Sequence, residues 1–179
     1  MRIDLDFEVL VLIGPPGSGK STLANLLSAL YGIAILCPDD IRKSMFGNKP
    51  YDYRDNDLVW DELYEELHPC MEQGTPVIID ATNTSHWHRR NLLSELPTHV
   101  KVTGLWFQVS LNECLKRNAA RADKLPVPEE VIQEAFESLI AYPPEYRDGY
   151  DNLLVIQNGK LARIKNPYGK TVSANRRIS

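Results

Sequence analysis

The sequence feature that most constrains this chain is a glycine-rich loop between an apolar run and a segment with helical spacing. Residues 14–22 read GPPGSGKST, which fits the pattern G-x-x-x-x-G-K-S. The apolar run 9–13 precedes them, and helical spacing continues through residues 22–27. A strand, a glycine-rich loop and a helix in this order are the context in which such a loop binds phosphate. A chance glycine-rich turn would not explain that context, so we predict a phosphate-binding loop.

The residue types of the loop predict how it holds a nucleotide. Its glycines let successive backbone N–H groups converge on phosphate oxygens, and the start of the following helix adds a favourable dipole. We expect Lys20 to reach the β- and γ-phosphates of ATP and the Ser21 hydroxyl to hold Mg²⁺. The residues of the loop predicted to bind ATP are Gly14, Pro15, Pro16, Gly17, Ser18, Gly19, Lys20, Ser21 and Thr22.

Length and composition are those of one globular domain. The chain has 179 residues, of which 43% are hydrophobic and 25% charged. It contains neither a signal-peptide pattern nor an apolar run long enough to span a membrane. Cys37, Cys70 and Cys114 are widely spaced and form no C-x-x-C pair, which favours reduced thiols. We therefore expect a cytoplasmic protein without disulfides.

Apolar runs alternate with segments of helical period along the chain. We predict strands at 9–13, 33–36, 77–80, 100–109 and 153–156, and helices near 20–31, 39–46, 56–73, 86–96, 110–122 and 128–141. The strands are continuously apolar, which is typical of a parallel sheet covered on both faces. The predicted fold is α/β, a doubly wound parallel sheet of about five strands with helices on both faces and a helical lid. We expect the domain to span 1–157.

Charge is distributed unevenly. All 24 acidic residues lie at or before Asp151, and six of the 20 basic residues lie after it, so residues 1–151 carry −10 and residues 152–179 carry +6. We expect 158–179 to form a basic C-terminal appendage. It would contact nucleic acid or another acidic partner, or remain a solvated terminus. The acidic body argues against broad nonspecific binding to duplexes.

A pair of carboxylates follows the second predicted strand. Asp39 and Asp40 begin a helix there, and they could cap it or face the phosphate-binding loop. A kinase needs a carboxylate at such a place to take the proton of an acceptor hydroxyl or to orient it. Arg42 lies three residues after Asp39 on the same helical face, where it could pair with Asp39 or clamp an acceptor phosphate.

The third predicted strand also ends in polar residues. Asp80 leaves a buried apolar run and could anchor a water bound to Mg²⁺. Thr82 and Asn83 carry short hydrogen-bonding groups that could line the acceptor site. The alternative is a simple turn that ends in a helix cap at Thr84 or Ser85.

A pair of arginines lies in the predicted helix near 110–122. Arg117 and Arg121 lie four residues apart on one helix face, where they would repel unless an anion such as the ATP tail lies opposite. A solvated basic face is the alternative.

His86 and His88 flank Trp87, but no third metal ligand is near them in the sequence, so we interpret them as surface or substrate-side residues.

Taken together, these segments resemble the phage-type 5′-hydroxyl polynucleotide kinase family, which belongs to the P-loop kinases. The resemblance covers roughly residues 7 to 142 in order and with similar spacing. The segments that carry it are the phosphate-binding loop, the D-D-I-R run at 39–42, Thr82-Asn83 followed by Arg89-Arg90, and the K-R-N-A-A-R run at 116–121. It continues weakly through 127–132.

The resemblance implies roles for individual residues. Asp39 would be the general base, Arg42 a ligand of the acceptor phosphate, and Arg121 the lid arginine on the ATP phosphates with Arg117 nearby. We accordingly predict Asp39, Lys20 and Arg121 as catalytic residues, and an acceptor site made of Arg42, Asp80, Thr82, Asn83 and Arg89. This chain departs from the family at Ala81, because the family member compared has an Asp directly before Thr-Asn.

The acceptor stays open between several classes. The first hypothesis is the 5′-OH end of DNA or RNA, which the arginines at 42, 89 and 90 favour because the adjoining nucleotide carries phosphate. The second is a small-molecule hydroxyl on a sugar or nucleoside, which the acidic body fits better. A protein that binds ATP and hydrolyses it slowly as a switch is the third. Tyr51, Tyr53, Trp60 and Trp87 could stack on a base or pack in a core.

Overall fold

The fold is a six-stranded sheet with helices on both faces, seen in a computed structural model that describes residues 7–47, 49–50, 52–121 and 125–168. The strands are β1 (Val9–Ile13), β2 (Ala34–Leu36), β3 (Val77–Ile79), β4 (Val102–Gln108), β5 (Asn152–Gln157) and β6 (Lys160–Arg163). Their order across the sheet is β2-β3-β1-β4-β5-β6. The five strands from β2 to β5 are parallel to their neighbours, and β6 is antiparallel.

The helices alternate with the strands. They are α1 (Lys20–Tyr31), α2 (Pro38–Phe46), α3 (Asn56–Glu72), α4 (His86–Glu95), α5 (Leu111–Ala119) and α6 (Glu129–Ala141), with short 3₁₀ turns η1 (Tyr53–Asp55) and η2 (Tyr146–Asp148). The predicted α/β fold, doubly wound and mainly parallel, is confirmed. Every element that the apolar pattern predicted is present, with most ends shifted by no more than two residues. The exception is α5, which ends at Ala119 and leaves Arg121 outside the helix that was predicted to contain it.

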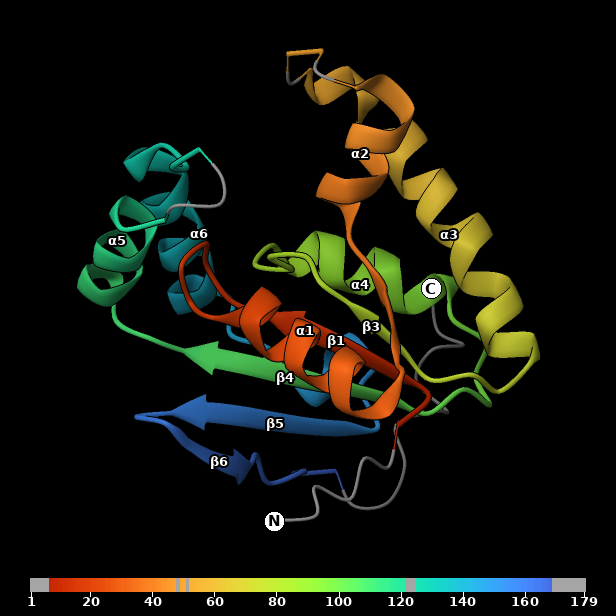
Figure 1. The fold of residues 1–179 in the computed structure, drawn as a ribbon. Helices are drawn as coiled ribbons and strands as arrows, with labels where there is room; N and C mark the ends of the chain where they lie inside the picture. Colours follow the sequence, from red (N-terminus) through yellow and green to blue (C-terminus); the bar gives the residue numbers. More distant parts are fainter. Residues whose placement is uncertain (1–6, 48, 51, 122–124, 169–179) are drawn as a thin grey trace.

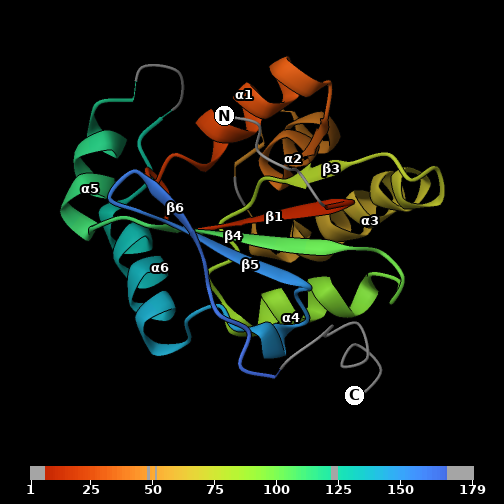
Figure 2. The same cartoon turned by 90° about the horizontal axis from the view of Figure 1, so that it is seen from below.

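Two hydrophobic cores lie on opposite faces of the sheet, because the central strands are buried on both sides. Leu10, Leu12 and Ile78 point to one face and pack with Ala24 and Leu27 of α1. The other face carries a larger core under α3, α4 and the end of α6. Its members include Val9, Val11, Ile79, Leu63, Leu67, Leu92, Leu93 and Leu139. Figure 2 shows α1 on one side of the strands and α4 and α6 on the other.

The sixth strand was not predicted, and its signal lies in the turn before it. Asn158 and Gly159 both have positive φ angles, 51° and 71°. This is the backbone that a tight two-residue hairpin needs, and Asn-Gly is the dipeptide that adopts it most readily. β6 pairs with β5 from Lys160 opposite Gln157 to Arg163 opposite Leu154. The basic segment that was expected to be an appendage therefore begins as an edge strand of the sheet.

Four of the helices pack as two pairs. α5 packs against α6 on one side, and α2 packs against α3 on the other. Figure 1 shows these two groups apart from each other, with the loop from β1 to α1 and the start of α4 between them. Residues 122–124, which come between α5 and α6 in the sequence, lie outside the described residues. The expected helical lid corresponds to α5 and α6.

No helix in the described part of the chain combines the length and the apolar character needed to cross a membrane. Cys37, Cys70 and Cys114 are all free thiols, and Cys37 and Cys114 are buried.

Candidate functional site

The phosphate-binding loop lies between the end of β1 and the start of α1, as the motif predicts. Gly14, Gly17 and Gly19 have positive φ angles of 159°, 80° and 103°, and the latter two lie in the region that favours glycine. The Nζ of Lys20 donates hydrogen bonds to the Pro15 carbonyl oxygen at 2.9 Å and to the Ser18 hydroxyl at 3.4 Å. The ammonium group therefore lies inside the concavity of the loop, where a phosphate would replace these oxygens as its partner.

Lys20 is the electrostatic centre of the site. Its side chain is buried, and this burial lowers its pKa from 10.5 to about 8. The carboxylates of Asp80 and Asp39 act in the opposite direction, and the guanidinium of Arg121 lowers the pKa further. Charge–charge effects of this kind require short distances or weak screening. The fold therefore brings Asp39, Asp80 and Arg121, from three separate segments, close enough to Lys20 to affect its pKa.

Asp80 and Asp39 come together because β2 and β3 are neighbours in the sheet. The backbone N–H of Asp80 donates to the carbonyl of Leu36 at 2.9 Å, just before the chain turns into α2. Asp39 lies in the first turn of α2, which starts with Pro38 at a position that needs no N–H donor. Asp80 is 8% exposed, whereas Asp39 is solvent-exposed. The carboxylate of Asp80 is thus shielded from solvent, whereas that of Asp39 is accessible to a second molecule.

These residues fit a magnesium ion bound together with phosphate. Mg²⁺ prefers one or two carboxylates plus substrate phosphates and keeps several waters, so it needs no complete cage of protein ligands. The Ser21 hydroxyl follows Lys20 directly, and Asp80 supplies a carboxylate close to the same lysine. Within the described ranges, no group of three or more His, Cys, Asp or Glu side chains could hold a metal alone. A magnesium ion at this site would be held by these side chains together with the phosphates of the nucleotide.

Arg117 contacts the phosphate-binding loop from α5. Its Nη1 donates to the Ser18 carbonyl at 3.4 Å, and its Nε donates to Glu113 at 2.7 Å, one helical turn earlier. α5 approaches the loop so closely that a Cβ on Gly17 would lie 2.4 Å from the carbonyl oxygen of Cys114. The glycine at position 17 is therefore required for packing as well as for its φ angle.

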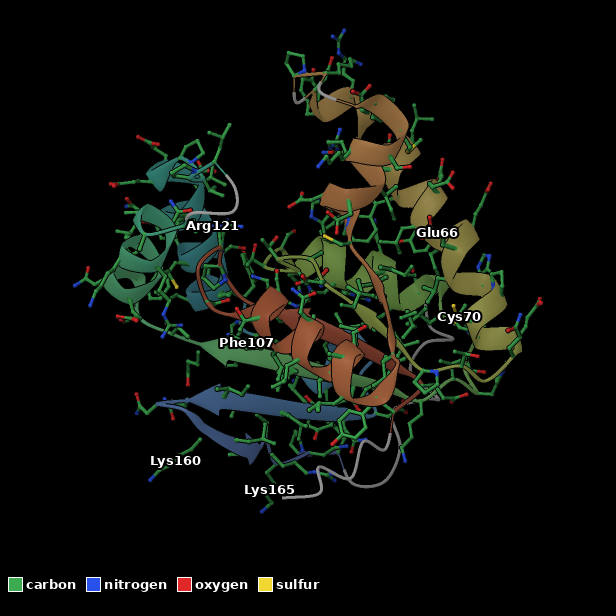
Figure 3. The ribbon with its side chains drawn as sticks, in the orientation of Figure 1. Glu66, Cys70, Phe107, Arg121, Lys160 and Lys165 are labelled. Carbon is green, nitrogen blue, oxygen red and sulfur yellow. The ribbon has the colours of Figure 1, made fainter. Side chains whose placement is uncertain are left out.

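Arg121 follows the last turn of α5. Figure 3 shows it on the side of α5 and α6 that faces α2. Asn118, the middle residue of the arginine motif, is buried and forms two hydrogen bonds with Val127, at 2.8 and 2.9 Å. These two hydrogen bonds join the end of α5 to the segment just before α6. Asn118 was not predicted to have a role, although it lies between the two arginines that were singled out in the sequence.

Arg42 is held by the region that follows its own helix. Its guanidinium donates to the carbonyl oxygen of Asp52 and to the side-chain oxygen of Asn56, and it lies 3.9 Å from the carboxylate of Asp55. The side chain is 19% exposed. Arg42 thus joins α2 to η1 and the start of α3, and an acceptor phosphate bound there would share the guanidinium with these partners.

Thr82 and Asn83 lie in the turn between β3 and α4. Thr82 is exposed, and its carbonyl accepts a 2.9 Å hydrogen bond from the N–H of Gly14. Asn83 has a φ angle of 47°, and its Nδ2 donates to the Leu12 carbonyl at 2.7 Å. Asn83 is 4% exposed, so its side chain holds the turn to β1. Ser85 then caps α4 through a hydrogen bond from the His88 N–H.

The structure corrects the prediction that Arg89 contacts the acceptor. Arg89 is fully buried, and its guanidinium forms an ion pair with Asp148 at 2.8 Å. The other donors reach backbone carbonyls of the turn before α4 and of the segment after α6, namely Asn83, Thr84, Tyr142 and Pro143. These five hydrogen bonds use all five N–H groups of an arginine. The partner Asp148 lies 59 residues away, and the sequence analysis did not identify it.

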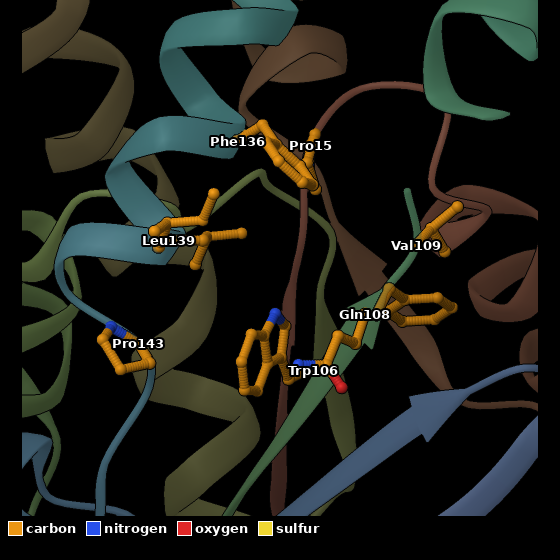
Figure 4. A pocket seen from close by; sticks show the side chains of 9 residues that line it. Pro15, Trp106, Gln108, Val109, Phe136, Leu139 and Pro143 are labelled. Atoms are coloured by element: carbon orange, nitrogen blue, oxygen red, sulfur yellow. The ribbon is translucent and has the colours of Figure 1, made fainter. Parts of the chain in front are cut away.

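A pocket of about 280 Å³ flanks the loop on the side of α6. Figure 4 shows its apolar lining, in which the indole of Trp106 lies opposite Leu139 and Pro143 and the ring of Phe136 lies close to Pro15. Pro15 is the one residue of the phosphate-binding motif among those that line it. The pocket is therefore beside the phosphate site and does not contain it.

Comparison with known proteins gives the family of the chain. The family model described as an AAA domain (AAA_33) matches residues 9–144. An adenylate kinase from Anaeromyxobacter sp. (strain K) is 30% identical over 134 residues, which are 70% of this chain and 56% of that protein. The "Putative bifunctional polynucleotide kinase/RNA ligase" of Autographa californica nuclear polyhedrosis virus is 29% identical over 151 residues, 74% of this chain and 21% of the viral protein.

Solved structures share the fold. A chain of the Pnkp1/Rnl/Hen1 RNA repair complex superposes with a TM-score of 0.68 and 24% identity, covering 78% of this chain and 46% of that one. A gluconokinase from Sinorhizobium meliloti 1021 has a TM-score of 0.56 and 20% identity, covering 85% and 83%. The chain spans about half the length of the adenylate kinase that it matches and about a fifth of the viral protein.

Proposed function

The chain belongs to the AAA domain family AAA_33, and from this we propose that it is a kinase that transfers the γ-phosphoryl group of ATP to the 5′-OH end of a polynucleotide. The observation that carries the proposal is geometric: the Nζ of Lys20 lies inside the loop, bonded to Pro15 and Ser18, and the exposed Asp39 begins the helix that follows the neighbouring strand end. It supplies a donor site and an exposed carboxylate beside it. A protein that only binds and slowly hydrolyses ATP needs no such carboxylate for an acceptor.

The donor side of the reaction is served by the loop and by the helices at its edge. Backbone N–H groups of the loop and the ammonium of Lys20 hold the phosphates, and Arg117 and Arg121 neutralise charge from the side of α5. Ser21, and Asp80 through a water, would hold Mg²⁺. When bound, the ion would offset charge on the β- and γ-phosphate oxygens. Catalysis of this kind consists mostly of positioning and charge stabilisation.

On the acceptor side, Asp39 has the role of general base. The acceptor oxygen attacks the γ-phosphorus, the bond from that phosphorus to the bridging oxygen breaks, and ADP leaves with the bond electrons. The hydroxyl proton passes to the carboxylate of Asp39. Asp39 suits this role because it is exposed, lies at the start of a helix and is close enough to Lys20 to affect its pKa.

The polynucleotide acceptor is favoured by the viral relative and by the positions of two residues. Arg42 lies on the next turn after Asp39, where a phosphate adjoining the reacting hydroxyl would lie. Thr82 is exposed beside the loop and offers a hydrogen-bonding hydroxyl. A phosphate on the acceptor would share the guanidinium of Arg42 with its partners in η1 and α3.

A small-molecule hydroxyl is the second candidate acceptor. The similarity in fold to gluconokinase extends over 83% of that chain, and residues 1–151 carry a charge of −10 that does not attract a polyanion. The same donor machinery would serve this reaction. The difference lies in what the residues around Asp39 contact.

The test is transfer of labelled γ-phosphate from ATP, with Mg²⁺, to a short 5′-OH oligonucleotide. A 5′-phosphorylated strand of the same sequence and a Lys20→Ala protein are the controls. Label on the 5′-OH strand alone, lost in the variant, is the expected result. Label on a sugar or nucleoside instead would show that the acceptor is a small molecule, the second candidate. ATP binding without transfer to either class would refute both.

A further inference from the structure

The start of α4 carries an exposed aromatic surface that the reaction chemistry does not use. Trp87 is 66% exposed in the first turn of the helix, and its ring meets that of His88 edge to face, with centroids 5.2 Å apart. Beside it, the ring of His86 stacks on Tyr142, with centroids 6.0 Å apart, and Tyr142 is 60% exposed. Large exposed aromatic rings are costly to leave in water and mark binding surfaces when they gather.

The charge of this surface differs from that of the rest of the body. Arg90 is exposed and lies three residues after Trp87, on the same face of α4. The first turn of α4 contains no acidic residue. The carboxylate of Asp148, which His86 approaches at 3.1 Å, is 1% exposed and is neutralised by Arg89. The surface therefore offers aromatic rings and a cation within a domain whose net charge is negative.

The position of this surface follows from the turn before it. Thr82 is bonded to Gly14 of the phosphate-binding loop, and Trp87 follows five residues later. Five residues of chain span at most about 18 Å. Trp87 thus lies within the reach of a few nucleotides from the point of phosphoryl transfer. The start of its helix is fixed to β1 by Asn83 and to the segment after α6 by Arg89.

We propose that Trp87 and Arg90 on α4 form a stacking surface for the single strand behind the 5′-terminal nucleotide of the acceptor. A base would lie on the indole ring and the neighbouring phosphate on the guanidinium, which is the usual combination in sequence-tolerant binding of single strands. This inference rests on the proposed function, because it names the part of the same acceptor that extends beyond the reacting end. A single sugar would not reach an outward-facing ring on this helix surface.

Binding can be measured without catalysis. A 5′-OH hexanucleotide labelled at its 3′ end is titrated with protein in the absence of ATP, and fluorescence anisotropy gives the Kd. Trp87→Ala is expected to raise this Kd about 5- to 100-fold, and Trp87→Phe to restore most of the affinity. Arg90→Ala should weaken binding and reduce the slope of log K against log salt by about one.

Tyr31→Ala is the matched control. Tyr31 is also an exposed aromatic residue, 52% accessible, but it ends α1 on the opposite face of the sheet. Its removal should leave the Kd unchanged. In transfer assays, Trp87→Ala should raise KM for the hexanucleotide and leave kcat and the KM for ATP unchanged.

The outcomes separate the two proposals. Weakened binding in Trp87→Ala supports the stacking surface even if the wild-type protein transfers no phosphate to the strand, in which case the proposed function alone fails. Equal binding by wild type and Trp87→Ala overturns the stacking surface and leaves the function intact. A wild-type protein that transfers phosphate to a sugar and does not bind the hexanucleotide overturns both.

Discussion

The N–H of Gly14 donates a 2.9 Å hydrogen bond to the carbonyl of Thr82, and this bond joins the phosphate-binding loop to the end of β3. A second bond runs from Asn83 to the Leu12 carbonyl at 2.7 Å. Both bonds involve backbone atoms of β1 or of the loop that follows it. They therefore fix the proposed donor side relative to the proposed acceptor side without any ligand. Side chains at the site can therefore be replaced one at a time, with predictable effects.

Replacing Asp39 with Asn should reduce phosphoryl transfer by about 10²- to 10⁴-fold while ATP still binds. The amide keeps the shape of the side chain but cannot accept the hydroxyl proton. Asp40→Asn is the matched control, since Asp40 is the adjacent exposed carboxylate in the same turn. Single-turnover transfer and nucleotide affinity are measured for both. Equal rates in wild type and Asp39→Asn would exclude Asp39 as the base.

ATP binding should take up a proton near pH 8. Burial lowers the pKa of Lys20 to about 8, so the free protein is roughly half protonated there, and phosphates in contact with the ammonium raise the pKa again. Affinity should therefore fall as pH rises above 8. Titration calorimetry at pH 8 in buffers of different ionisation enthalpy measures the uptake. Lys20→Met should show none at this pH, and uptake that persists in this variant would assign the proton to another group.

The lowered pKa of Lys20 also affects folding. The unfolded chain holds this proton up to about pH 10.5 and the folded chain only up to about pH 8. Between these values the unfolded state binds more protons, so the contribution of Lys20 to stability rises with pH in that window. Chemical denaturation of wild type and Lys20→Met at pH 7 and 9.5 tests this. The wild type should gain stability relative to the variant at the higher pH, and a relative loss would contradict the argument.

Breaking the pair between Arg89 and Asp148 should destabilise the fold by about 3–5 kcal/mol, because it leaves a buried charge without its partner. Arg89→Met is the test variant. Arg90→Met, at the next and exposed position of α4, should alter stability by no more than about 0.5 kcal/mol. Urea denaturation measures both. Similar midpoints for the two variants would mean that the network around Arg89 does not hold the start of α4.

Replacing Gly17 with Ala should destabilise the protein by about 2–5 kcal/mol and weaken ATP binding. The new Cβ would lie 2.4 Å from the Cys114 carbonyl oxygen, so α5 or the loop must move. Gly32→Ala is the control, because Gly32 also has a positive φ, of 68°, but meets nothing within 4 Å. Its cost is the backbone strain alone, about 1–3 kcal/mol, with ATP affinity unchanged. Thermal unfolding and nucleotide titration compare the two.

The sequence determined the loop and the order of the elements, because both depend on local chemistry. The glycine pattern at 14–19 needs no distant partner to be interpreted, and the buried strands are continuously apolar. Ser85 and Ser110 mark helix starts through bonds to their own chain three residues on. The hairpin that leads to β6 also depends on local sequence, because the dipeptide Asn158-Gly159 favours its turn.

Tertiary structure alone decided which polar residues face a ligand. Arg89 and Arg90 are adjacent and chemically alike, yet one is fully buried and the other exposed, because only the fold brings Asp148 from 59 residues away to the first. Trp87 could not be assigned to core or surface by pattern and proved to be exposed. Local interactions fix what an element is, whereas the partner of a buried charge depends on how distant elements pack.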